Sequence, residues 1–200
     1  MSFWDQQFSV SGFKYGTAPN AFVVSQAHRI APSSRVLVPG DGEGRNGVWL
    51  AQQGHSVTAV DNSQVGLDKA QALATERGVS VTAIHADLAQ WRPEPESVDA
   101  VVLVYLHLPS GLRSSVHRDL AQALRPGGWW ILEAFHPQQL MHSSGGPKDE
   151  AMLYTPELLS ADTAGSLVPV EVWSGEVSLD EGLGHQGLAH VTRWVGQRLA

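Results

Sequence analysis

The chain has 200 residues and an apolar content of 42%, which is enough to bury one core, so we expect one domain over residues 1–200 and not two. It contains no cysteine, which excludes disulfides, thiolate metal sites and a cysteine nucleophile and fits a reducing, cytoplasmic location. The net charge of −7 with scattered Lys and Arg argues against a nucleic-acid partner, and the lack of a leader pattern or of a run of roughly 20 apolar residues argues against a membrane span.

The first 30 residues stand outside the repeating pattern that follows them. Their aromatic residues include Trp4, Phe8, Phe13 and Tyr15, and a helical pattern follows near residues 18–30. We expect residues 1–30 to cap the sheet, with Tyr15 as a candidate for the substrate pocket.

From about residue 35 to residue 135, short apolar runs alternate with helical patterns, which is typical of a parallel sheet built from βαβ units. Apolar residues recur on one face of Gln64–Arg77 and every four residues from Leu112 to Leu124, so both segments should be amphipathic helices. The predicted strands are Arg35–Pro39, Ser56–Val60, Val79–His85, Val98–Val104 and Trp129–Phe135. The RPGG sequence before the last of these strands predicts a turn.

The pattern changes after residue 135. Residues 136–155 are polar and Gly-rich, and a short helix is expected at Pro156–Ser160. We therefore expect a lid or substrate loop over residues 136–165, because loops after such strands carry binding residues. Its candidate pocket residues are His136, Gly146 and Lys148.

Two alternating strands complete the chain. They are expected at Val168–Leu179 and Ala189–Arg198, and the EGLGHQG sequence between them is short enough for a hairpin. An antiparallel hairpin therefore closes the otherwise parallel sheet.

A glycine-rich loop follows the first strand, in the sequence VLVPGDGEGRNG. Ligands of open α/β sheets bind beyond the carboxyl ends of the strands, so this loop predicts a nucleotide-type cofactor. Gly42, Gly44 and Gly47 satisfy the dinucleotide pattern, whereas Gly40, Gly42 and Gly44 give the tighter spacing expected for S-adenosylmethionine (SAM). The glycines alone leave both cofactors open.

The charges of the loop favour SAM. A diphosphate would be repelled by Asp41 and Glu43, with only Arg45 to compensate, whereas a sulfonium tolerates an acidic loop. Asp61, at the end of the second strand, can accept hydrogen bonds from ribose hydroxyls, and Asp87 and Leu88 after the third strand can contact adenine. Only about 65 residues follow the fifth strand, too few for the remainder of a dinucleotide-dependent dehydrogenase.

These motifs together resemble the class I SAM-dependent methyltransferases, and within them the tellurite-resistance and thiopurine methyltransferase-like branch. The sequences FWDQQFSVSGFKYGTAPNAFV, VPGDGEGRN, VTAVDNS, HADL, YLHLP and RPGGWWILEAF fall in the family's order. The resemblance implies a Rossmann-like α/β fold with helices on both faces of a seven-stranded mixed sheet of order 3-2-1-4-5-7-6, strand 7 being antiparallel. One departure is Val38, where many relatives carry an acidic residue. The expected SAM-binding residues are Gly40, Asp41, Gly42, Gly44, Asn46, Asp61, Asn62, Asp87, Leu88 and Tyr105.

The YLHLP sequence follows the fourth strand, beside the expected cofactor cleft. Tyr105 is expected to pack on SAM, and His107 is a candidate base that faces the acceptor, since a base helps when the acceptor carries a proton. The alternative for His107 is a hydrogen-bonded structural histidine before Pro109. His136, His142 and His185 match no compact ligand spacing, so no metal is expected.

The sequence thus predicts a SAM-dependent methyltransferase, monomeric or homodimeric, that acts on a small-molecule acceptor with a thiol, chalcogen or amine as the accepting group. Two alternatives remain open: a non-catalytic SAM or nucleotide sensor, and an NAD-dependent oxidoreductase.

Overall fold

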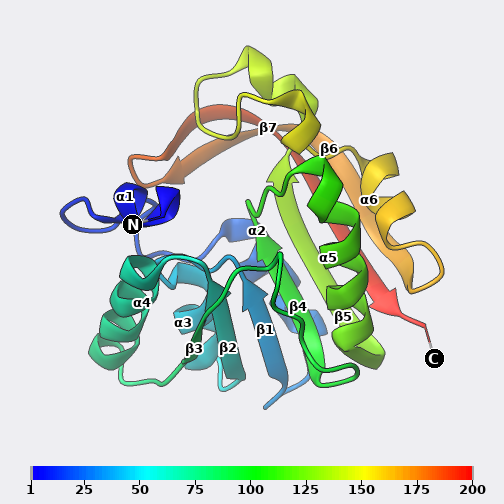
Figure 1. Cartoon of the computed structure of the whole chain (residues 1–200), viewed down its shortest axis with the longest axis horizontal. Coiled ribbons are helices and arrows are strands. Elements are labelled where there is room, and N and C mark those ends of the chain that lie inside the picture. Colours follow the sequence, from blue (N-terminus) through cyan, green and yellow to red (C-terminus); the bar gives the residue numbers. More distant parts are fainter. Residues whose placement is uncertain (1, 200) are drawn as a thin grey trace.

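Seven strands form one mixed sheet in the computed structural model, which describes residues 2–199 (Figure 1). Their order is β3-β2-β1-β4-β5-β7-β6, and β7 runs antiparallel to both of its neighbours. This arrangement confirms the predicted fold class. The strands are β1 (Arg35–Pro39), β2 (Ser56–Asp61), β3 (Thr82–His85), β4 (Val98–Val104), β5 (Leu124–Phe135), β6 (Leu167–Glu181) and β7 (His185–Arg198).

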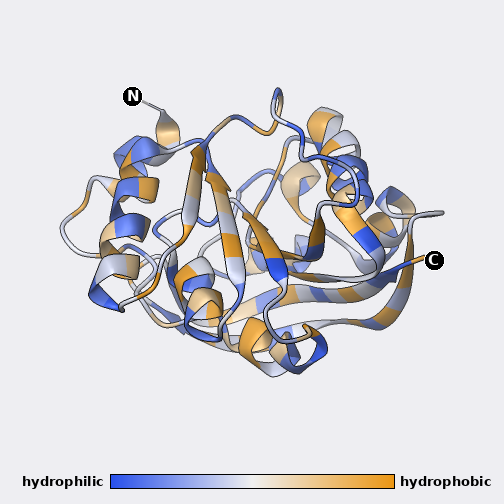
Figure 2. Cartoon of the chain, turned by 90° about the horizontal axis from the view of Figure 1, so that it is seen from below, coloured by the Kyte–Doolittle hydropathy of each residue, from blue (hydrophilic) through white to orange (hydrophobic). Residues whose placement is uncertain are grey.

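Helices cover both faces of the sheet. Helices α2 and α3 pack with one face of the central strands, and α4 packs beside α3, whereas α5 and α6 pack on the opposite face. Figure 2 shows apolar residues concentrated on the central strands between these layers. The helices are α1 (Phe3–Phe8), α2 (Ala21–Gln26), α3 (Arg45–Gln52), α4 (Gln64–Glu76), α5 (Ser110–Ala123) and α6 (Pro156–Asp162), with 3-10 turns η1 (Ala27–Arg29), η2 (Pro137–Met141) and η3 (Glu150–Met152).

Helix α4 illustrates how the sequence sets an element's ends. Its N-cap Ser63 accepts a hydrogen bond from the Gly66 N–H, and the chain leaves the helix at Gly78, where φ is +69°. The predicted face is buried: Leu67, Ala70, Leu73 and Ala74.

Several predicted boundaries differ from the structure, and two of them have a clear physical reason. Strand β3 begins at Thr82 rather than Val79, because the valines before it pack between α3 and α4. Helix α5 ends at Ala123, and the predicted RPGG turn is a bulge inside β5, where residues 125–128 lie opposite Asp99.

The hairpin of β6 and β7 is longer than predicted. Its pairing continues to Glu181 and His185, so only residues 182–184 form the turn. The hairpin tip therefore reaches the N-terminal segment, where the Gly184 N–H donates to the Lys14 carbonyl at 3.1 Å (Figure 1).

Candidate functional site

The glycine loop joins β1 to α3 at the carboxyl edge of the sheet. Gly42 has a φ of +58°, and its N–H donates to Asp61 Oδ2 at 2.9 Å, while the Ser63 N–H donates to Asp61 Oδ1 at 2.8 Å. Burial raises the pKa of Asp61, and these two hydrogen bonds oppose the rise. The carboxylate thus joins the glycine loop to the start of α4.

The residues around Gly42 fit an adenosyl group. A carboxylate offers about four acceptor positions, and Asp61 uses two of them for backbone N–H groups, so two remain for ribose hydroxyls. A Cβ atom at Gly42 would lie 2.9 Å from the Phe8 ring of α1. Residue 42 therefore has to be a glycine, because the Phe8 ring of the N-terminal segment occupies the space that a Cβ atom would need.

The acidic residues of the loop do not line this surface, contrary to the charge argument from sequence. Asp41 is buried, and its Oδ1 accepts from the Gly47 N–H at 3.1 Å. A Cβ at Gly47 would lie 2.3 Å from Asp41 Oδ2, so Gly47 makes room for this carboxylate and not for a diphosphate. Glu43 accepts from Lys69 Nζ at 2.8 Å and from the Lys14 N–H at 2.7 Å, which holds the N-terminal segment in place.

The remaining predicted cofactor residues lie along the same edge of the sheet. Asp87 and Asn62 are exposed, and Leu88 is buried in the core beneath them. Asn46 is buried, and its Oδ1 accepts from the Asn20 N–H at 2.9 Å. Asp87 and Asn62 are therefore accessible to a ligand, whereas Asn46 supports the backbone before α2.

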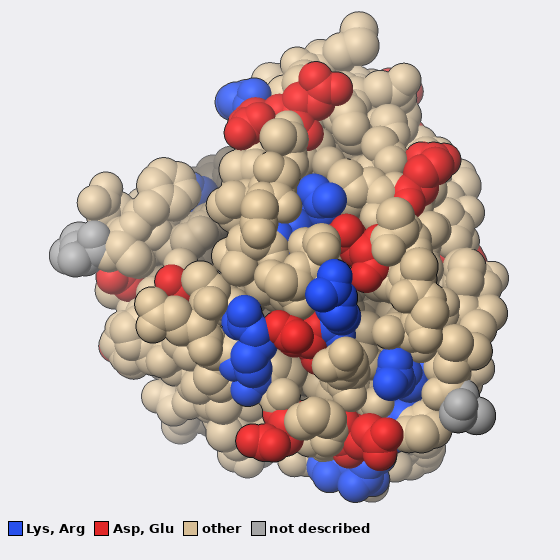
Figure 3. Space-filling model, turned by 45° about the vertical axis from the view of Figure 1, so that its right-hand side comes forward, with Lys and Arg blue, Asp and Glu red and all other residues tan. Residues whose placement is uncertain are grey.

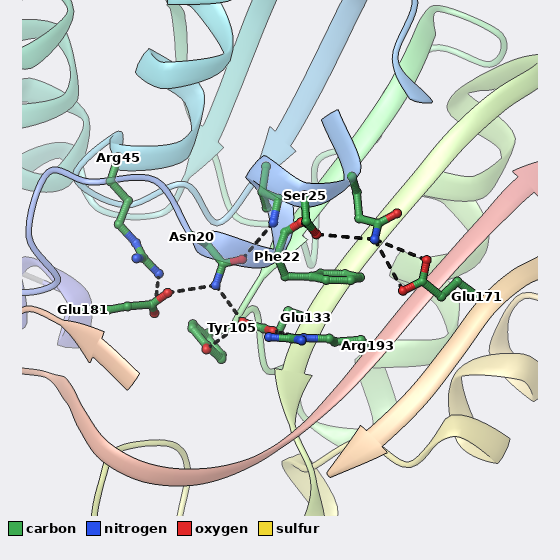
Figure 4. A network of polar contacts seen from close by, with 11 residues as sticks. Asn20, Phe22, Ser25, Arg45, Tyr105, Glu133, Glu171, Glu181 and Arg193 are labelled. Atoms are coloured by element: carbon green, nitrogen blue, oxygen red, sulfur yellow. Dashed lines mark hydrogen bonds and ion pairs between the residues drawn. The ribbon is translucent and has the colours of Figure 1, made fainter. Parts of the chain in front are cut away.

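Tyr105 belongs to a buried polar network that the sequence did not predict (Figure 4). Its φ is +52°, and its hydroxyl donates to Glu133 Oε1 at 2.8 Å. Asn20 Nδ2 donates to the same oxygen at 2.6 Å, and Arg193 Nε donates to Glu133 Oε2 at 2.6 Å. Burial, followed by the negative charge of Glu133, raises the pKa of Tyr105.

Glu181 extends the network to the hairpin tip. It accepts from Asn20 Nδ2 and from Arg45 Nη2, each at 2.9 Å. The network therefore ties the glycine-loop helix α3, the start of α2, β5 and the hairpin together. One signal for it was present in the sequence, since Glu133 is the single charged residue within the buried WWILEAF strand.

His107 is held by backbone groups through both ring nitrogens. Nδ1 lies 2.7 Å from the Met152 carbonyl, and Nε2 accepts from the Phe135 N–H at 3.2 Å. Burial lowers the pKa of His107 to about 4. These contacts favour the structural interpretation of His107 over the catalytic one.

The predicted pocket residues are only partly brought together. Gly146 lies against the Phe135 ring, where a Cβ would come within 2.8 Å, and the Tyr15 ring packs on that of His185 at a tilt of 39°, with centroids 4.4 Å apart. His136 lies at the start of η2, and Lys148 is exposed.

Three features of residues 2–199 bear on ligand and partner classes. None of their helices has the length and hydrophobicity that a bilayer crossing requires. They contain no group of three or more His, Asp or Glu side chains placed to hold a metal ion. On the face that Figure 3 shows, acidic and basic side chains are interspersed rather than gathered in a basic patch.

Comparison with known protein families indicates similarity to methyltransferases. A family model described as a methyltransferase domain matches residues 36–128. An uncharacterized methyltransferase of Bacillus subtilis, YodH, is 27% identical over 124 residues, which are 62% of this chain and 53% of that protein. The chain spans about half the length of the curated relatives that it matches.

Solved structures share the fold over nearly the whole chain. A structure reported for the conversion of a disulfide bond into a thioacetal group during echinomycin biosynthesis has a TM-score of 0.75 at 18% identity, covering 91% of this chain and 82% of that one. TehB from Haemophilus influenzae has a TM-score of 0.71 at 16% identity, covering 98% of this chain and 65% of that one. At these identities the likeness shows the fold alone.

Proposed function

We propose that this protein, in which residues 36–128 match a family model described as a methyltransferase domain and whose sheet has the order 3-2-1-4-5-7-6, transfers the methyl group of SAM to a small molecule. One observation carries the proposal: the bare Gly42 bend is hydrogen-bonded to the Asp61 carboxylate at the strand ends of a sheet with an antiparallel β7. This hydrogen bond supports the assignment of the glycine loop as the adenosyl-binding loop.

The bound cofactor would supply a methyl group that its sulfonium already activates. The protein therefore needs chiefly to position the acceptor and exclude water, and positioning can contribute roughly 7–11 kcal/mol. Asp61 would accept hydrogen bonds from the ribose, and Asp87 and Leu88 would contact the adenine. Phe8 and the segment that Glu43 and Lys69 anchor would cover the loop and keep water out.

We propose that the acceptor binds between the N-terminal segment and residues 136–155. Tyr105 stacks on Phe135, with ring centroids 4.5 Å apart. The backbone of Gly146 also lies against the Phe135 ring. We assign the acceptor as a small molecule with a thiol, chalcogen or amine group. The order of the sequence motifs supports the tellurite-resistance and thiopurine methyltransferase-like branch.

The two alternatives make different predictions. A dinucleotide-binding oxidoreductase has the parallel order 3-2-1-4-5-6, which an antiparallel β7 inserted between β5 and β6 does not follow. A non-catalytic sensor would share the cofactor loop and differ only in lacking turnover.

Calorimetry followed by an acceptor screen tests the proposal. We expect S-adenosylhomocysteine and SAM to bind, NAD not to bind, and S-adenosylhomocysteine to form from SAM with at least one of an alkyl thiol, selenide, a phenol or a primary amine. Binding of NAD without SAM would overturn the proposal. Binding of SAM without turnover on any acceptor would favour the sensor.

A further inference from the structure

His185 occupies the junction of the segments that surround the proposed acceptor space. It is the first residue of β7 and is 5% exposed. Its ring centroid lies 4.4 Å from those of Tyr15 and Tyr105 and 5.1 Å from that of Phe135. This one imidazole therefore contacts three segments: the N-terminal segment, the end of β4 and the end of β5.

The two ring nitrogens of His185 have different surroundings. Nδ1 is buried without a hydrogen-bond partner, and the Glu181 Oε2 atom lies 3.6 Å from it as an ion-pair neighbour. Nε2 forms no hydrogen bond with any of residues 2–199, and the Cδ2–Nε2 edge of the ring lies against Gly145, where a Cβ would come 2.5 Å from Cδ2 and 3.2 Å from Nε2. Unlike His107, whose two nitrogens are both bound to backbone groups, His185 thus keeps Nε2 free beside the candidate substrate loop.

Glu181 is fixed in its position near Nδ1. Arg45 and Asn20 donate to its two oxygens, so its place does not depend on the histidine. A carboxylate beside Nδ1 favours the Nδ1–H tautomer, which leaves the Nε2 lone pair available, and stabilises the imidazolium that forms when Nε2 takes a proton.

Burial keeps the His185 ring neutral before reaction, against the pull of two nearby carboxylates. Burial lowers its pKa, the carboxylates of Glu181 and Glu133 oppose this, and the cation of Arg45 adds to it. The other groups packed on the ring are the phenols Tyr15 and Tyr105, for both of which burial raises the pKa, so they remain uncharged at neutral pH.

We infer that His185 Nε2 is the base for acceptors that carry a proton, with Glu181 as its positioning residue; this rests on the proposed methyl transfer. As the acceptor's lone pair forms the bond to the methyl carbon, the carbon–sulfur bond breaks and its electron pair stays on sulfur, giving S-adenosylhomocysteine. The acceptor's proton passes to Nε2 and then to solvent. No further reactant is needed.

The test compares His185→Gln, Glu181→Gln and a matched control, His28→Gln, whose ring is exposed on η1. Each variant is first checked for S-adenosylhomocysteine affinity, which should stay within twofold of the wild type for His185→Gln and His28→Gln; Glu181→Gln removes the counter-charge of Arg45 in α3 and is therefore compared at saturating SAM. With the best acceptor from the screen, we expect His185→Gln to lower kcat about 100-fold or more at pH 7 and Glu181→Gln to lower it less. The deficit should shrink above the acceptor's own pKa, where solvent has already removed the proton.

A rate deficit for His185→Gln that is constant at all pH values, or no deficit, overturns the inference while leaving the methyltransferase proposal intact. Failure of the wild type to bind S-adenosylhomocysteine overturns the methyltransferase proposal itself. A second measurement needs no acceptor: nitrogen-15 NMR of the S-adenosylhomocysteine complex should show His185 neutral with a proton on Nδ1 and none on Nε2 at pH 7. A proton on Nε2 in the neutral ring, or a permanently charged ring, contradicts the inference.

Discussion

The Glu133 carboxylate offers the sharpest test of how the network holds the site together. Its side chain is 1% exposed and receives hydrogen bonds from Asn20, Tyr105 and Arg193. In Glu133→Gln an amide group would face one of these donors, and Arg193 would lose its counter-charge. Removing one partner of a buried ion pair costs about 3–5 kcal/mol, and because the Arg193 side chain is 27% exposed we expect a loss of about 2–4 kcal/mol in the free energy of unfolding.

Glu171→Gln is the matched control, because Glu171 also accepts from an arginine, Arg29, at 3.0 Å and from a glutamine, Gln26, but its side chain is 41% exposed. We expect this control to cost less than about 1 kcal/mol. Urea unfolding followed by circular dichroism measures both losses. If Glu133→Gln proves no more destabilising than Glu171→Gln, the network does not stabilise the fold in the way that we argue.

Three further predictions concern single residues of the site. Asp61→Asn should weaken S-adenosylhomocysteine binding by tenfold or more in calorimetry, whereas Asp68→Asn on the exposed face of α4 should not change it; equal affinities would remove Asp61 from the cofactor site. Burial raises the pKa of Asp41 from 3.8 to about 7. Between about pH 4 and pH 7, the Asp41 carboxyl therefore holds a proton in the folded protein but has lost it in the unfolded chain. The free energy of unfolding should fall as the pH rises through this window. Asp41→Asn should flatten that slope in urea titrations at pH 4.5 and 7.5, and an unchanged slope would contradict the shift. His107→Ala should destabilise the fold by about 1–3 kcal/mol, because it leaves two backbone groups unpaired, yet retain turnover within a few fold; a turnover loss of 100-fold in a folded variant would instead restore His107 as the base.

Local patterns in the sequence were sufficient for the strands, most helices and the glycine loop. Apolar periodicity reports which residues face a core, and a helix such as α4 carries its own cap in Ser63 and its own end at Gly78. Asp61 was also predictable, because the carboxyl ends of parallel strands meet at one edge of a sheet. The boundaries of β3 and β5 were not predictable. The valines before β3 pack between α3 and α4 and do not extend the strand, and the RPGG residues form a bulge opposite Asp99 inside β5 and not a turn.

By itself, the sequence determined the strands, the helices and the position of the glycine loop, because each depends on residues close together in the chain, whereas the strand order was implied by the resemblance of the motifs to a known family. Only the tertiary structure decided which charges face the site. Asp41 accepts a hydrogen bond from the Gly47 N–H inside the protein, and both ring nitrogens of His107 contact backbone groups. Glu133 and Glu181 accept hydrogen bonds from Asn20, which is more than 100 residues away from each of them in the sequence. A side chain's hydrogen-bond partners depend on which distant segments the fold brings beside it, and no local pattern encodes that.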